Sequence, residues 1–147
     1  MAEEYRGRPV LPGRASGTAL VSRAPFDALA SFKRCLQEGG RPAFSGDESN
    51  ADILGAQLTG CVLCVPQAVG STSAGTTWDL IACRRLEPAA LLFAESIDSL
   101  SAGGLVVARV WDGSAVVVVD RLGEDFLTEV TTGCSLSVSE DGIVTVA

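Results

Sequence analysis

The chain is organised around residues 65–81, which read VPQAVGSTSAGTTWDLI. An apolar, β-branched run over residues 61–66 stops at a proline, and a loop of small and hydroxylated residues follows it. An apolar pattern at helical spacing resumes at Trp78, so the stretch predicts a strand, a loop and a helix. The first N–H groups of a helix lack intrahelical acceptors and carry partial positive charge. The hydroxyls of residues 71–73 would therefore lie in a corner suited to an anionic ligand.

The composition limits the class of protein. The 147 residues favour one domain, and 47% apolar with 20% charged residues is a globular balance. The net charge of −7 opposes a nucleic-acid or anionic-membrane partner, although a merely soluble acidic surface is the more common explanation of such a charge. The start, Met-Ala-Glu-Glu-Tyr, lacks the basic-then-apolar order of a secretory signal, and the apolar runs are too short to span a bilayer. We expect a cytoplasmic protein without membrane or nucleic-acid partners.

The chain contains no histidine. This excludes a Ser-His-Asp triad, a Cys-His dyad, a phosphohistidine carrier and an ordinary zinc hydrolase site. Any base in the hydroxyl loop is therefore not an imidazole.

Five cysteines form no framework of disulfide spacing and are expected to be reduced thiols. Cys61 and Cys64 form a CxxC pattern inside an expected strand. Residues three apart in a strand point to opposite faces, so this pair is expected to be buried rather than redox-active or metal-binding.

The flanking sequence predicts many short strands. Residues 1–12 lack periodicity and are expected to form a flexible arm, with a single domain over residues 13–147. Thr76 and Asp79 have the form of a capping box. Gly103-Gly104 is expected to end a helical turn. Expected strands cover residues 17–22, 61–66, 89–94, 105–110, 116–119, 134–138 and 143–146, and a turn at residues 139–142 joins the last two. Residues 28–33 and 125–130 remain undecided between helix and strand. Residues 37–50 are expected to form a loop with a short strand near residues 43–44. The fold class is therefore a β-dominated α/β domain with a barrel-like sheet and two or three short helices.

The order of these features resembles the small subunit, or swivelling domain, of aconitase X enzymes. The resemblance covers the chain from about Gly13 to its C-terminus. Its most specific element is the family's Gly-Arg-Gly-Ser-Ser-Ser loop after a strand ending in proline, which corresponds here to Ala68–Ser73. The matching segments are Gly17–Ser22, Leu58–Pro66, Gly70–Ala74, Val117–Asp120, Thr132–Cys134 and Asp141–Val144.

The resemblance implies a swivelling β/β/α domain of the aconitase superfamily, which closes over a large domain that holds an iron–sulfur cluster. It implies that Ser71 is the base that removes a proton α to a carboxylate. Gly70, Thr72 and Ser73 would bind the substrate. The cluster would be held by a partner large subunit and not by this chain, which would act as the small subunit of a heterodimer or higher assembly on a small carboxylate substrate.

The loop departs from the family at one place. Family members usually carry Gly-Arg before the Gly-Ser, whereas this chain has Ala68-Val69. Of the two aconitase X dehydrations, that of cis-3-hydroxy-L-proline tolerates this loss better than that of mevalonate 5-phosphate, because a phosphate needs more positive charge. A non-catalytic anion-binding module of the same fold, or a capped helix without any ligand, are the remaining alternatives.

Overall fold

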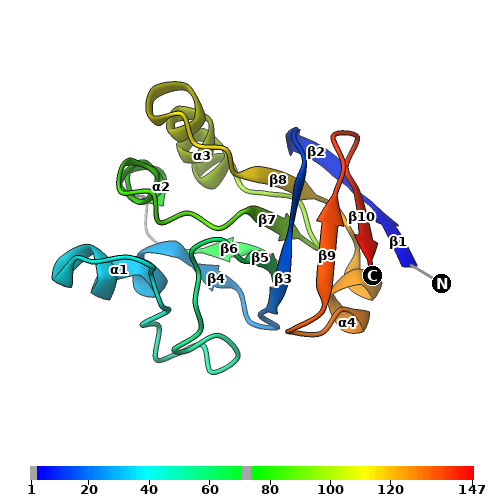
Figure 1. The fold of residues 1–147 in the computed structure, drawn as a ribbon, viewed down its shortest axis with the longest axis horizontal. Coiled ribbons are helices and arrows are strands. Elements are labelled where there is room, and N and C mark those ends of the chain that lie inside the picture. Colours follow the sequence, from blue (N-terminus) through cyan, green and yellow to red (C-terminus); the bar gives the residue numbers. More distant parts are fainter. Residues whose placement is uncertain (1–2, 71–73) are drawn as a thin grey trace.

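A computed structural model describes residues 3–70 and 74–147 of the chain. The molecule has three layers, with helices on one side, parallel strands in the middle and antiparallel strands on the other side (Figure 1). This arrangement confirms the β/β/α fold class expected from the sequence.

One large sheet runs through the middle and outer strand layers. Its strands lie in the order β1-β10-β9-β3-β5-β7-β8-β2, and a separate two-stranded sheet pairs β4 with β6. The strands are β1 (Glu3–Arg6), β2 (Arg8–Leu11), β3 (Ala15–Val21), β4 (Phe26–Asp27), β5 (Val62–Val65), β6 (Ala68–Val69), β7 (Ala90–Phe93), β8 (Val117–Asp120), β9 (Ser135–Val138) and β10 (Ile143–Val146).

The centre of the sheet is parallel and buried on both faces. Strands β3, β5, β7 and β8 pair in parallel, and every residue of β5, β7 and β8 is buried. Along β5, Leu63 and Val65 pack into the core under the helices, whereas Val62 and Cys64 pack into the core on the opposite face. The continuous apolar run in the sequence therefore reports a strand covered on both sides.

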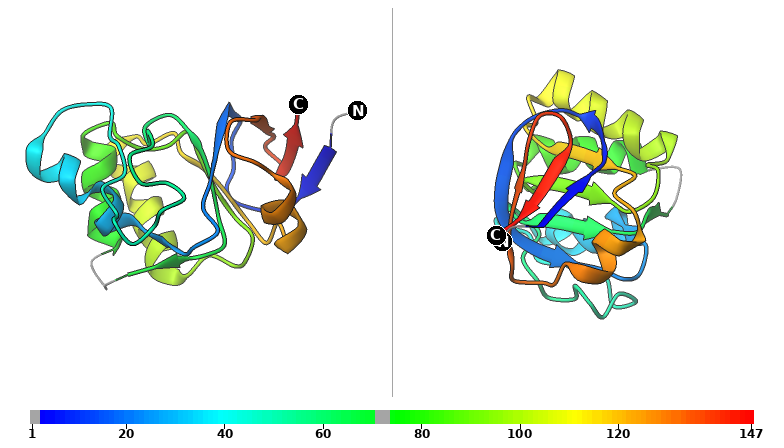
Figure 2. Two further views of the ribbon diagram at one scale, coloured as in Figure 1. Left: turned by 90° about the horizontal axis from the view of Figure 1, so that it is seen from below. Right: turned by 90° about the vertical axis from the view of Figure 1, so that its right-hand side faces the viewer.

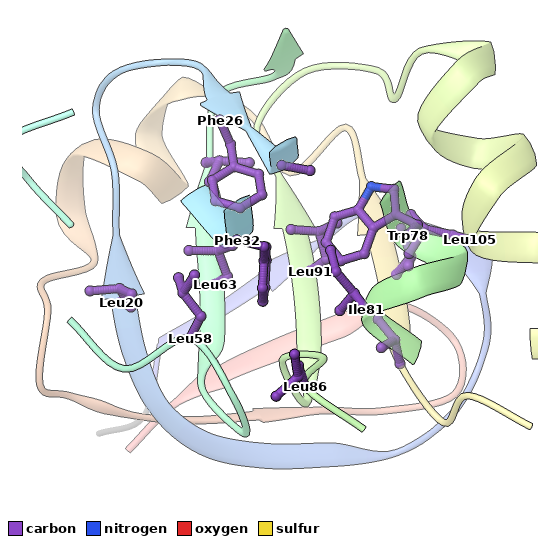
Figure 3. Packing of buried hydrophobic residues seen from close by; sticks show 14 of the residues in the cluster. Leu20, Phe26, Phe32, Leu58, Leu63, Trp78, Ile81, Leu86, Leu91 and Leu105 are labelled. Atoms are coloured by element: carbon purple, nitrogen blue, oxygen red, sulfur yellow. The ribbon is translucent and has the colours of Figure 1, made fainter. Parts of the chain in front are cut away.

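Three helices cover one face of the parallel strands, and the described residues form four helices altogether (Figure 2). Phe32, Phe26 and Trp78 form an aromatic cluster between this helical layer and the sheet, with ring centroids 6.0 to 6.5 Å apart (Figure 3). Aromatic side chains bury large apolar areas, so this cluster anchors the helices on the sheet. The helices are α1 (Ala28–Glu38), α2 (Ala74–Cys83), α3 (Ser99–Asp112) and α4 (Glu124–Glu129), of which α4 packs in the other core.

Helix α3 corrects the prediction of a strand over residues 105–110. The two glycines expected to end a helical turn lie inside the helix instead. A Cβ atom on Gly104 would lie 2.5 Å from the Cα atom of Gly75 in α2. The glycine therefore allows the two helix backbones to touch, and this contact outweighs the strand preference of the valines that follow it.

The N-terminal segment is part of the sheet and is not a loose arm. β1 pairs with β10 and β2 pairs with β8, both antiparallel. Tyr5 packs its ring on Phe126 at a centroid distance of 5.2 Å, and Leu11 is buried. The segment has too few apolar residues to show a period in the sequence, but these few reach the two cores.

Gly7 separates β1 from β2 and brings the two ends of the sheet together. Its N–H donates to the Gly142 carbonyl at 2.9 Å, and a Cβ atom at this position would lie 2.5 Å from the Asp120 carbonyl oxygen. The two edge strands of the sheet, β1 and β2, do not pair with each other, yet they belong to one segment that bends at Gly7. The sheet is therefore semi-closed.

Candidate functional site

The hydroxyl loop follows the carboxyl end of the parallel sheet. Only Pro66 and Gln67 separate β5 from β6, and β6 leads directly to Gly70. The carboxyl ends of parallel strands are where open α/β sheets bind ligands. The predicted strand and helix are thus confirmed as β5 and α2, and the chain leaves β5 at the edge of the sheet that favours a site.

The small β4/β6 sheet holds the start of this loop. Phe26 pairs with Ala68 and Asp27 pairs with Val69, in parallel. Gly70 follows with a φ of 132°, a backbone conformation that side chains other than glycine rarely adopt. The chain therefore enters the loop through a position that requires glycine.

Asp27 places a carboxylate beside Gly70. Its Oδ1 atom accepts the N–H of Ala30 at 3.1 Å and so caps α1. A Cβ atom placed on Gly70 would lie 3.1 Å from the same oxygen. The sequence prediction missed this residue, although an aspartate directly before an apolar helical pattern is a known cap signal.

The amino-terminal ends of α2 and α3 meet each other. Gly75 of α2 faces Gly104 of α3, and a Cβ atom on Gly75 would lie 3.7 Å from the Leu100 carbonyl oxygen. Helix α2 already includes Ala74, so Thr76 lies within the helix and the predicted capping box at Thr76 is wrong. Two helix amino-termini at one place favour negative charge there.

The predicted site residues divide between described and undescribed positions. Gly70 lies at the end of β6, as above. Val69, which stands where the family has arginine, is an apolar side chain that is 45% exposed. Ser71, Thr72 and Ser73 lie outside the described residues.

The cysteines do not converge on a metal or cluster. Cys61 packs in the core under the helices, whereas Cys64 packs in the opposite core. Burial raises the pKa of Cys61 to about 12 and also raises the pKa of Cys64. Over residues 3–70 and 74–147, no three histidine, cysteine or carboxylate side chains are grouped to hold a metal ion. The described residues of this chain do not fit an iron–sulfur cluster, which needs converging thiolates.

A separate groove of about 520 Å³ lies at the amino end of β5, lined in part by Gly17, Gln57 and Thr132. Most of its polar side chains have partners within the protein. The Gln57 amide donates to the Thr59 carbonyl at 2.9 Å, and the Thr132 hydroxyl accepts the Val21 N–H at 3.0 Å. The groove therefore offers few free polar groups, and the loop edge is the better candidate site.

Comparison with known proteins agrees with this geometry. A family model described as the aconitase X swivel domain matches residues 4–146. The chain belongs to the aconitase X swivel domain family. This family is part of the aconitase-type hydro-lyases and implies a large-subunit partner.

Solved structures share the fold of this aconitase X swivel domain. The crystal structure of Thermococcus kodakaraensis aconitase X in its holo-form superposes with a TM-score of 0.81 at 21% identity, covering 99% of this chain and 98% of that one. The solution NMR structure of a UPF0107 protein superposes with a TM-score of 0.76 at 24% identity, covering 99% of both chains. A search of curated proteins finds no match. Among the described helices of the swivel domain, none is long and apolar enough to cross a membrane.

Proposed function

We propose that this chain is the small subunit of an aconitase X-type hydro-lyase, with its active site at the interface with an iron–sulfur large subunit. The observation that carries the proposal is the family match over residues 4–146, which includes the whole strand–loop–helix unit around Gly70. The cluster belongs to the large subunit in this proposal, because four cysteines of this chain are divided between two separate cores and Cys83 is exposed.

Ser71 is the proposed base. Its hydroxyl oxygen would take the proton from the carbon next to the substrate carboxylate, and the cluster of the large subunit would accept the departing hydroxyl group. A serine is a feeble base at its ordinary pKa and needs an environment that stabilises its alkoxide. The first N–H groups of α2 and the partial positive charge at its amino-terminus would serve this purpose.

Gly70, Thr72 and Ser73 are the proposed substrate-binding residues. Backbone N–H groups and hydroxyls would hold the substrate carboxylate. The contact of Gly70 with Asp27 fixes the entry to the loop and adds a negative charge beside it. A substrate that carries its own ammonium group suits this charge better than a phosphate does.

We therefore propose cis-3-hydroxy-L-proline as the substrate. Its ring nitrogen is cationic, so one carboxylate is partly balanced within the molecule. Mevalonate 5-phosphate is the alternative substrate, and its dianionic phosphate would need cations supplied by the large subunit.

The experiment is to assemble the chain with an aconitase X large subunit and to measure turnover of both compounds. The wild-type pair is expected to dehydrate cis-3-hydroxy-L-proline, and Ser71→Ala is expected to abolish turnover while the pair still forms. Ser73→Ala is the matched control, and it is expected to raise KM with a smaller loss of kcat. Normal turnover by the Ser71→Ala pair would rule out Ser71 as the base.

A non-catalytic anion-binding module is the second candidate. The exposed Val69 at the position of the family arginine favours it. In that case the lone chain would bind inorganic phosphate or acetate in a calorimetric titration, and its pair with the large subunit would turn over neither compound.

A further inference from the structure

Helix α3 exposes an apolar face. Val110 is 72% exposed and Trp111 is 79% exposed, values far above those of buried side chains. Apart from Ser99, the exposed residues of α3 are apolar or glycine. We define the apolar face as Leu100, Val106, Val107, Val110 and Trp111.

The charged residues of α3 do not dilute this face. Arg109 turns back to the body of the protein, where its guanidinium donates to the Pro12 carbonyl at 3.0 Å and to the Val116 carbonyl at 2.9 Å. Asp112 is the last residue of the helix. Between Leu100 and Trp111 the one charged residue is Arg109, and its guanidinium is held against the body of the protein.

Helix α1 lies in the same layer and has an ordinary polar surface. Its exposed residues include Lys33, Arg34 and Glu38. Arg34 and Glu38 form an exposed ion pair at 3.5 Å. A helix that is apolar on every side is typical of a buried helix, so α3 differs from α1 in the way expected if another chain covers it.

The size of the apolar face fits a protein interface. Its five side chains expose roughly 500 Å² of apolar surface, which is within the range of the largest patches on monomers and is often functional. A specific interface buries about 800 Å² on each partner. The apolar face supplies more than half of that area and needs adjoining surface to complete it.

The adjoining surface is the amino-terminal end of α2. Leu100 lies at the amino-terminal end of the apolar face, and its carbonyl oxygen is next to Gly75 at the start of α2. A chain that covers the start of α2 would meet the apolar face directly. Two copies of a chain with a net charge of −7 repel each other, so a different chain is the better occupant.

We propose that the apolar face of α3 is the docking surface for the large subunit. This inference rests on the proposed function for the identity of the partner. The partner surface is apolar and uncharged where it meets Val110 and Trp111. The hydrophobic contact holds the two chains together, so the proposed catalytic loop does not have to contribute to binding the partner.

Binding to the aconitase X large subunit tests this proposal. The intrinsic fluorescence of the pair is measured during titration, because the chain has two tryptophans and only Trp111 is exposed, whereas Trp78 is 2% exposed. We expect a blue shift on binding that Trp111→Phe removes. Val110→Lys is expected to weaken Kd more than tenfold. Leu54→Lys, at a residue that is 50% exposed and outside the apolar face, is the matched control and should bind like wild type.

Three results would overturn the proposal. They are wild-type affinity in Val110→Lys, no binding of the wild-type chain to the large subunit, or a homodimer of the lone chain in sedimentation that Val110→Lys dissociates. The proposed function is tested separately by Ser71→Ala. A pair that forms through the apolar face but dehydrates neither compound would keep the docking surface and reject the function.

Discussion

Asp120 is the buried carboxylate that ties the N-terminal segment to the sheet. Its side chain is fully buried, and Arg8 binds it with two hydrogen bonds of 2.9 and 2.7 Å. The N–H of Ile97 donates to the same carboxylate at 2.8 Å. One residue thus joins β2, β8 and the turn before α3.

We expect Asp120→Ala to lower the free energy of unfolding by about 3 kcal/mol, because it leaves a guanidinium and a backbone N–H without their acceptor. Glu140→Ala is the control, since Glu140 and Arg14 form an exposed pair at 3.9 Å. Exposed pairs contribute little, so the control should be unchanged. Urea unfolding of both variants measures the difference, and equal stabilities would contradict the prediction.

The thiol of Cys61 has a pKa raised to about 12, mainly by burial. An unfolded thiol has a pKa of about 8.5, so the folded state holds its proton more tightly than the unfolded state. The stabilising contribution is therefore complete below pH 8.5 and declines as the pH rises toward 12. Urea unfolding between pH 8 and 11 should show a shallower decline for Cys61→Ala than for wild type.

Alkylation gives an independent check on the same thiols. At pH 8, iodoacetamide should modify the exposed Cys83 and leave the buried Cys64 intact in the folded protein. Peptide mapping after the reaction identifies the modified residues. Rapid modification of Cys64 would mean that β5 opens readily.

Among the contacts between whole elements, the crossing of α2 and α3 depends on one glycine, Gly104. A Cβ atom on Gly104 would lie 2.5 Å from the Cα atom of Gly75 and 2.8 Å from its carbonyl oxygen, whereas a Cβ atom on Gly103 has no atom within 4 Å. Backbone atoms of a packed helix cannot move aside as a flexible side chain can.

We expect Gly104→Ala to destabilise the protein by about 2 kcal/mol through overpacking. Gly103→Ala is the neighbouring control, and it should stabilise by about 0.5 kcal/mol because alanine is the better helix residue. Thermal and urea unfolding of both variants test the pair. A stable Gly104→Ala protein would mean that the helices can separate without cost.

The elements that the sequence predicted well are those with a local signal. The apolar run of β5 and the turn between β9 and β10 were both read from neighbouring residues. Helix α3 is not predicted from the sequence because Gly104 serves a contact with α2 and the valines of the helix face outward. Such a helix contradicts its own local propensity, and only tertiary packing explains it.

The sequence predicts the candidate site only where the signal is local. The small residues around Gly70 indicate a loop, and the absence of histidine excludes an imidazole base. The contact of Asp27 with Gly70 was not predictable, because it depends on the pairing of β4 with β6. A contact between distant segments leaves no pattern in either of them.

At the scale of the whole molecule, the segment Glu3–Leu11 completes both ends of the sheet. We expect deletion of residues 1–11 to lower Tm on the order of 10 °C, because it exposes the edges of β10 and β8 and removes the partner of Asp120. Calorimetry measures the change.

A synthetic peptide of residues 1–12 should restore part of the lost Tm, and the same peptide with Arg8→Ala should restore less. An unchanged Tm after deletion would return this segment to the role of a loose arm.

The pairing of Glu3 with Val146 has a consequence for synthesis of the chain on the ribosome. Strand β1 must wait for its partner β10, because all the other described strands lie between them in the sequence. Pairings between such distant segments form slowly, since a long loop must close before any contact forms. Strands β3, β5, β7 and β8 can assemble earlier and β2 can cover the edge of β8, but β3 keeps an open edge until β9 is made and β10 keeps one until β1 pairs with it. The nascent protein is therefore most vulnerable to aggregation before these pairings form, and the bent segment around Gly7 ends that period.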